Sequence, residues 1–148
     1  MTSLRKKIIA IGGALAYPTI NLSPDITREH FSGKWVLVTG ASHGIGRVLT
    51  EKLISVGANV FLIARSEADL RLLCAKAKQM GSSADYCAID LRDREKLEQL
   101  CLKLRETLPQ LDYFFCNAGK SIHRKINDAQ DRLHDYDRTM DLNYRSLV

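Results

Sequence analysis

Short apolar runs alternate with amphipathic stretches along this chain from about residue 33 onward. Nearly continuous apolar runs predict four buried strands, at residues 35–39, 59–64, 86–89 and 112–116. Apolar residues at helical spacing predict helices at residues 44–55, 66–81, 92–107 and from about 131 to the last residue, 148. Such an alternation predicts an α/β fold, a doubly wound parallel sheet with helices on both faces. We interpret the chain as the N-terminal part of that sheet, with about four strands.

Each predicted helix has one apolar face, as expected for a helix that packs on a sheet. The faces of the first three helices comprise Val48, Leu49, Leu53 and Ile54; Leu70, Leu73, Cys74 and Ala77; and Leu97, Leu100, Cys101, Leu104 and Leu108. Ser66 is followed three residues later by Asp69, which matches a capping box and predicts the start of the second helix.

The composition is that of an ordinary soluble globular protein, with 45% hydrophobic and 26% charged residues. The formal net charge is +5 and the basic residues are scattered, which argues against a nucleic-acid partner. The cysteines lie in apolar runs without the spacing of metal ligands. This predicts reduced core thiols in a cytoplasmic protein, at Cys74, Cys87, Cys101 and Cys116.

Residues 1–30 differ from the domain that we predict over residues 31–148. Basic residues 5–7 precede an apolar run at residues 8–17, and residues 21–25 have the composition of a linker. The run is shorter than the ~20 residues that span a bilayer. Three interpretations stay open: a cleaved signal peptide, a helix packed on its own domain or a partner, and a peripheral anchor at a membrane surface.

Three glycines, Gly40, Gly44 and Gly46, join the first predicted strand to the first helix. In a doubly wound sheet this turn points unpaired helical N–H groups at a crevice, where the helix dipole favours an anion. Glycine permits a tight turn at Gly40 and a close approach of pyrophosphate at Gly44 and Gly46. The alternative is a turn that needs glycine for its dihedral angles alone. The position between a buried strand and an amphipathic helix favours the phosphate site.

The spacing T-G-x-x-x-G-x-G from Thr39 to Gly46 resembles the signature of the short-chain dehydrogenase/reductase family. Further family motifs follow in order over about residues 33–148: Asp90-Leu91, Asn117-Ala118-Gly119 and Asn143. The resemblance implies a Rossmann-like fold, an NAD(P) cofactor and hydride transfer between nicotinamide and a carbonyl or alcohol carbon. It implies cofactor contacts by Gly40, Ser42, His43, Gly44, Ile45, Gly46, Asp90, Leu91, Asn117, Ala118 and Gly119. Asn143 would act in catalysis by holding a water that feeds a proton relay.

The end of the second predicted strand, I-A-R-S, favours NADP(H) over NAD(H). NAD-specific folds place an acidic residue there, which accepts a hydrogen bond from the ribose 2′-OH. Arg65 can instead form a forked, charge-assisted pair with a 2′-phosphate, and Ser66 can add its hydroxyl and backbone N–H. His43 lies where NADP-using family members often carry a basic residue. The alternative is a surface arginine that pairs with Glu67 or Asp69.

One family element is missing from the sequence. The family acts through a Tyr-x-x-x-Lys pair, and none of the 5 tyrosines here has a lysine four residues later. We therefore expect a chain truncated before its catalytic pair, which carries the cofactor-binding half and is itself inactive. When full length it is expected to form a homo-oligomer.

A local resemblance narrows the substrate. The Ser121-Ile122-x-Arg124 step and the run D-R-L-H-D-Y-D-R-T-M resemble bacterial fatty acyl-CoA reductases. The alternative is that Arg124, His134 and Arg138 are solvated charges beside a helix. Three functions stay open: an NADP-dependent reductase of a lipid-like carbonyl or acyl thioester, a ketone or alcohol reductase with a soluble substrate, and a non-catalytic dinucleotide-binding protein.

Overall fold

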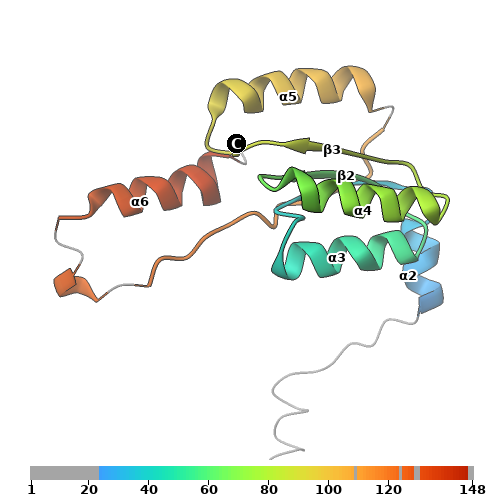
Figure 1. Cartoon of the computed structure of the whole chain (residues 1–148), viewed down its shortest axis with the longest axis horizontal. Coiled ribbons are helices and arrows are strands. Elements are labelled where there is room, and N and C mark those ends of the chain that lie inside the picture. The colour runs from blue at the N-terminus through green and yellow to red at the C-terminus, as the bar shows by residue number, and fades with distance from the viewer. Residues whose placement is uncertain (1–23, 109, 124, 129–130, 147–148) are drawn as a thin grey trace, which may run out of the picture.

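The computed structural model describes residues 24–108, 110–123, 125–128 and 131–146. Within them the strands form one parallel sheet in the order β3–β2–β1–β4 (Figure 1). The strands are β1 (Trp35–Thr39), β2 (Asn59–Ala64), β3 (Ala84–Ala88) and β4 (Tyr113–Phe115). The predicted α/β class and all four strand positions are confirmed. Strand β3 begins earlier than predicted because residues 84–88 pair one to one with residues 60–64 of β2.

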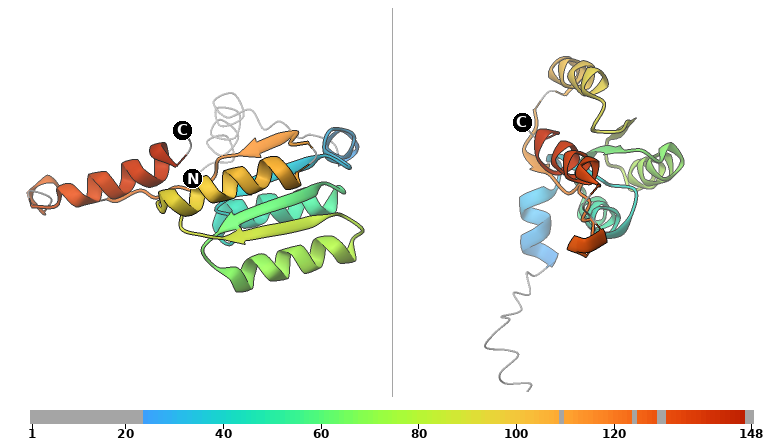
Figure 2. Two further views of the ribbon diagram at one scale, coloured as in Figure 1. Left: turned by 90° about the horizontal axis from the view of Figure 1, so that it is seen from above. Right: turned by 90° about the vertical axis from the view of Figure 1, so that its left-hand side faces the viewer.

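Helices cover both faces of the sheet, as predicted (Figures 1 and 2). The α-helices of the described residues are α2 (Pro24–Phe31), α3 (Gly44–Ser55), α4 (Glu67–Gln79), α5 (Arg94–Thr107) and α6 (Leu133–Met140), and a π-helical segment, Asp141–Arg145, continues α6. Helices α3 and α4 lie on one face and α5 lies on the other. The last predicted helix begins at Leu133, two residues after the predicted start, and changes from α-helix to π-helix at Asp141.

The strands bury side chains on both faces, which explains their nearly continuous apolar sequence. Val36 and Val38 of β1 pack with Leu53 and Ile54 of α3 in one core cluster. Leu37, the residue between the two valines, packs on the opposite face in the cluster that contains Leu100 of α5. The sheet thus separates two apolar layers, and its strand ends are fixed relative to both.

The segment before β1 is more ordered than the predicted linker. Pro24 and Asp25 begin helix α2, and Phe31 at its end packs on β4. The ring of Phe31 lies 4.8 Å from that of Tyr113 and 6.4 Å from that of Phe115, centroid to centroid. The predicted apolar run at residues 8–17 lies outside the described residues. Among the described residues, no helix is long and apolar enough to cross a bilayer.

Two predicted helix faces were partly wrong. Val48 is 54% exposed, because α3 turns Gly46, Thr50, Leu53 and Ile54 inward instead. Thr50 is tolerated inside since its hydroxyl donates to the Gly46 carbonyl at 2.8 Å. On α5 the buried position is Leu100, and Cys101, about 100° further round the helix, faces solvent.

The cysteines are only partly the core thiols that we predicted. Cys74 is buried, and burial raises the pKa of its thiol to about 11. Cys87 is half-buried, whereas Cys101 and Cys116 are exposed. Cys116 directly follows β4, which lies at an edge of the sheet that the described residues form. The prediction was therefore wrong for Cys101 and Cys116.

The start of α4 also differs from the predicted capping box. Ser66 is the N-cap residue, but its hydroxyl donates to the Asp69 carboxylate instead of accepting a backbone N–H. Asp69 also pairs with Arg47 of α3, with 3.4 Å between Nη1 and Oδ1. The carboxylate thus connects α4 to α3, and this tertiary contact competes with the local cap.

Candidate functional site

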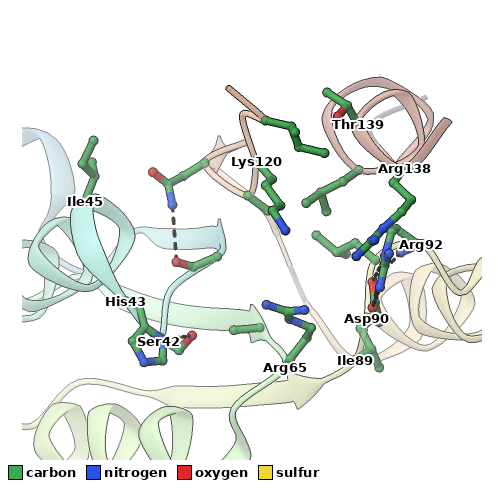
Figure 3. Close-up of a pocket in the computed structure, with 18 residues that line it drawn as sticks. Ser42, His43, Ile45, Arg65, Ile89, Asp90, Arg92, Lys120, Arg138 and Thr139 are labelled. Carbon is green, nitrogen blue, oxygen red and sulfur yellow. Dashed lines mark hydrogen bonds and ion pairs between the residues drawn. The ribbon is translucent and has the colours of Figure 1, made fainter. Parts of the chain in front are cut away.

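A cavity of about 530 Å³ lies at the carboxyl ends of the strands (Figure 3). The chain runs outward from β1 to β3 and then returns to the other side of β1 with β4, so the strand order reverses there. Open α/β sheets bind ligands at such a reversal. The walls come from the turn after β1, the loops after β2, β3 and β4, and helix α6. They include Gly40, Ser42, His43, Ile45, Arg65, Asp90, Leu91, Arg92, Asn117, Ala118, Gly119, Lys120, Ile122, Arg138, Thr139 and Leu142.

The structure brings most predicted cofactor residues to this cavity. Gly44, Gly46, Ser66 and Asn143 do not line it. Gly44 has a φ of +54°, and a Cβ built on it meets no atom within 4 Å, so its outer side is open to a ligand. Asn143 lies instead at a smaller cavity of about 260 Å³.

Gly46 has a packing role that the glycine pattern did not predict. A Cβ built on Gly46 would lie 2.3 Å from the Gly40 carbonyl oxygen and 2.4 Å from Asn117 Nδ2. Because real Cβ atoms do not approach that closely, glycine is required there to let α3 meet the turn and Asn117. Gly40, with a φ of +67°, is likewise covered by Asn117 and Ala118.

Asn117 holds the glycine turn against the end of β4. Its Nδ2 donates to the carbonyls of Thr39 and Gly40 at 3.1 and 3.3 Å. In the opposite direction, the Thr39 hydroxyl accepts from the backbone N–H groups of Asn117 and Ala118 at 3.1 and 3.0 Å. The glycine turn after β1 and the Asn117-Ala118-Gly119 segment after β4 therefore form one hydrogen-bonded unit, which we call the Asn117 unit.

We expect Thr39→Val to lower the free energy of unfolding by about 1–3 kcal/mol. Thr39 is only 2% exposed, so the Ala118 N–H would lose its hydrogen-bond acceptor in a buried place. Urea unfolding of the purified full-length protein measures this. Thr107→Val is the matched control, since the Thr107 hydroxyl donates to the Lys103 carbonyl on an exposed helix surface. A loss no larger than that of the control would contradict the role given to Thr39.

Arg65 points into the cavity from the end of β2 (Figure 3). It makes no ion pair or hydrogen bond in the part of the chain that the structure describes. The alternative partners are engaged elsewhere. Glu67 accepts from Arg71 at 2.9 Å and from the Tyr86 hydroxyl at 3.3 Å, and Asp69 pairs with Arg47. The guanidinium is therefore available to a ligand.

His43 and Ser42 form the lip of the cavity next to the glycines. The Nδ1 atom of His43 lies 2.9 Å from the Ser42 hydroxyl, and its Nε2 lies 3.8 Å from the Asp69 carboxylate. The imidazole is mostly exposed, so a protonated ring would add positive charge at this edge.

Asp90 is the carboxylate among the cavity residues, and Arg92 binds it. Arg92 Nη2 lies 2.6 Å from Asp90 Oδ2, and the Arg92 backbone N–H donates to Oδ1 at 3.1 Å. These bonds lower the pKa of Asp90 to about 2, so the carboxylate stays ionised at neutral pH. The pair places a fixed anion and a fixed cation side by side on the β3 side of the cavity.

The residues present fit a dinucleotide. The cavity is within the roughly 300–1,000 Å³ of small-molecule sites, and it begins at an open, glycine-rich helix start. A protein-family model described as short chain dehydrogenase matches residues 34–148 of the sequence. The chain belongs to the short-chain dehydrogenase family. Its four-stranded parallel sheet is the N-terminal part of that family's Rossmann-like fold.

Several members of the short-chain dehydrogenase family are similar to this chain. A fatty acyl-CoA reductase of Acinetobacter baylyi is 38% identical over 121 residues, which cover 82% of this chain and 41% of that protein. A short-chain type dehydrogenase/reductase from Mycobacterium marinum matches with a TM-score of 0.70 at 25% identity, over 85% of this chain and 50% of that one. An NADH-dependent reductase, A1-R′, complexed with NAD matches with a TM-score of 0.69 at 30% identity, over 82% and 50%. The chain thus spans half or less of these relatives.

Asn143, the predicted catalytic member of the family motifs, ties the π-helical segment to the loop after β4. Its Oδ1 accepts from the Lys120 N–H at 2.9 Å and its Nδ2 donates to the Lys120 carbonyl at 3.0 Å. Both ends of the amide are thus used by backbone. The role in holding a water stays a prediction.

The sequence did not identify every residue of the site. Arg92, Lys120, Arg138, Thr139 and Leu142 also line the cavity. Arg92 and Lys120 directly follow recognised motifs, so their neighbourhood was a usable signal. Arg138 and Thr139 lie in the run that resembles fatty acyl-CoA reductases. That resemblance did not place them at this cavity, because only the path of the chain brings their helix there. Of the charges named beside it, His134 pairs with Asp135 at 3.4 Å outside the cavity, and Arg124 lies outside the described residues.

Proposed function

We propose that the protein is an NADP-dependent reductase of a carbonyl or acyl thioester, with a fatty acyl-CoA as its substrate. The observation that carries the cofactor choice is the free guanidinium of Arg65 at the end of β2, inside the cavity. A 2′-phosphate can accept a forked pair of hydrogen bonds from it. Glu67, whose carboxylate could have bound a free 2′-OH, is held by Arg71 and Tyr86.

The charge of the cavity supports the same choice. Among the described residues that line it, Arg65, Arg92, Lys120 and Arg138 are cationic, and Asp90 carries the one carboxylate. A dinucleotide with a 2′-phosphate carries roughly two more negative charges than one without. The cationic wall therefore fits NADP(H) better than NAD(H).

The substrate class rests on the relatives. The similarity to the Acinetobacter baylyi fatty acyl-CoA reductase extends over 82% of this chain. The bound nicotinamide would supply a hydride to the thioester carbonyl carbon. With one proton, the thioester then gives an aldehyde and a free thiol. The residues of this chain bind and orient the dinucleotide for that step. The proton donor would come from a Tyr-x-x-x-Lys pair, which these 148 residues do not contain.

An assay of the purified full-length protein tests this function. We expect NADPH oxidation that depends on a long-chain acyl-CoA, with one equivalent of free thiol released for each aldehyde formed. The 148-residue chain alone is expected to give no turnover above a no-enzyme control. Turnover with ketones but not with acyl-CoA would favour the soluble-substrate alternative. Tight dinucleotide binding without any turnover would favour the non-catalytic one.

Homo-oligomer formation and a peripheral membrane contact through residues 8–17 remain predictions. A long-chain substrate would make the contact useful, because such molecules partition into membranes.

A further inference from the structure

Helix α6 forms one wall of the cavity. Among the lining segments, this one is the farthest in sequence from the glycine turn. Figures 1 and 2 show it beyond the ends of the strands, after the long connection that follows β4. Arg138, Thr139 and Leu142 bring this region to the cavity. A ligand that fills the cavity would therefore contact the sheet and α6 together.

The arginines in and around α6 differ in their partners. Arg132 pairs with Asp135 at 2.9 Å, and Arg145 pairs with Asp141 at 2.6 Å. Arg138 lies between them in sequence and lines the cavity, and its guanidinium makes no ion pair or hydrogen bond with any other residue that the structure describes. In Figure 3 its side chain lies beside that of Arg92.

Arg138 thus lies near Arg92, whose guanidinium is already paired with the Asp90 carboxylate. Both oxygens of Asp90 accept from Arg92, and Arg65 and Lys120 add further positive charge to the same cavity. Like charges in one pocket repel each other, and a ligand of high negative charge relieves that repulsion. A neutral ligand that only stacks on the guanidinium groups would not relieve it.

We propose that Arg138 is a second residue that recognises the charge of a 2′-phosphorylated dinucleotide, and that it couples ligand binding to the position of α6. The inference rests on the proposed function, since it concerns the same cavity and cofactor. Arg65 would act from the sheet side and Arg138 from the helix side. The ligand then bridges two parts of the chain that the Asn143–Lys120 hydrogen bonds also join.

Dissociation constants for NADPH and NADH in the purified full-length protein test the charge effect. Arg138→Met, which keeps the side-chain length, is expected to weaken NADPH binding about five- to tenfold and NADH binding less than twofold. Arg138→Lys, which keeps the charge, should stay within about threefold of the parent. Arg145→Met is the matched control, because Arg145 is paired and lies outside the cavity.

Hydrogen exchange of residues 133–145 tests the coupling in the unmutated protein. We expect NADPH to slow exchange there more than NADH does at equal saturation, and Arg138→Met to remove the difference. Equal protection by the two dinucleotides in the parent would overturn the proposal, whatever the variants do. So would equal weakening of NADPH and NADH in Arg138→Met. If Arg65→Ala loses the NADPH preference while Arg138→Met keeps it, this inference alone fails. A parent that binds neither dinucleotide refutes the proposed function as well.

Discussion

Replacing Arg65 with alanine is expected to raise the dissociation constant for NADPH by roughly ten- to a hundredfold. The constant for NADH should stay within about threefold of the parent. The guanidinium lies in the cavity and forms no ion pair or hydrogen bond within the described residues, so its removal breaks no such contact there. A hydrogen bond to a charged group contributes about 1.5–3 kcal/mol, and each 1.4 kcal/mol changes an affinity about tenfold.

Titration of the purified full-length protein with both dinucleotides measures the effect. Arg145→Ala is the matched control. That arginine pairs with Asp141 at 2.6 Å outside the cavity. Arg65 would not select the cofactor if the parent bound NADH as well as NADPH, or if Arg65→Ala kept the whole preference.

The sheet could be predicted from the sequence because its signal is local. Each central strand is a nearly continuous apolar run. Trp35 and Asn59 are the first residues of β1 and β2, and Gly40 directly follows β1. Parallel pairing then carries the register from strand to strand, as the one-to-one pairing of β2 with β3 shows. The weaker elements depended on tertiary contacts. Helix α2 starts in an apparent linker because Phe31 finds the rings of Tyr113 and Phe115.

The candidate site divides in the same way. Gly40, Asp90 and Asn117 lie one or two residues after strands, so strand positions alone bring them to one edge of the sheet. Arg138 lies well past the last strand, and no periodicity states where its helix goes. The function of Gly46 was also hidden, because a motif gives the residue type without the atoms that contact it. Those atoms are the Gly40 carbonyl and the Asn117 amide.

That contact gives the largest expected loss of stability. Gly46→Ala should lower the free energy of unfolding by about 2–3 kcal/mol, although alanine is favoured over glycine within a helix by about 1 kcal/mol. The new Cβ would lie 2.3 Å from the Gly40 oxygen and 2.4 Å from Asn117 Nδ2. Neither atom can yield cheaply, because these two groups hydrogen-bond each other at 3.3 Å inside the turn. Helix α3 must therefore move away from the turn, which also displaces the N–H groups that we propose bind phosphate.

Gly44→Ala separates this clash from the general cost of losing a glycine. Gly44 has a φ of +54°, yet a Cβ there meets no atom within 4 Å. The left-handed conformation alone should cost about 1–2 kcal/mol. Thermal and urea unfolding of the purified full-length protein should rank the variants as parent, Gly44→Ala, Gly46→Ala, from most to least stable. Dinucleotide titrations should show weaker binding in both variants, because both glycines shape the turn that we propose contacts the ligand. If Gly46→Ala proved as stable as Gly44→Ala, the close approach of α3 to Asn117 would not be what requires glycine at position 46.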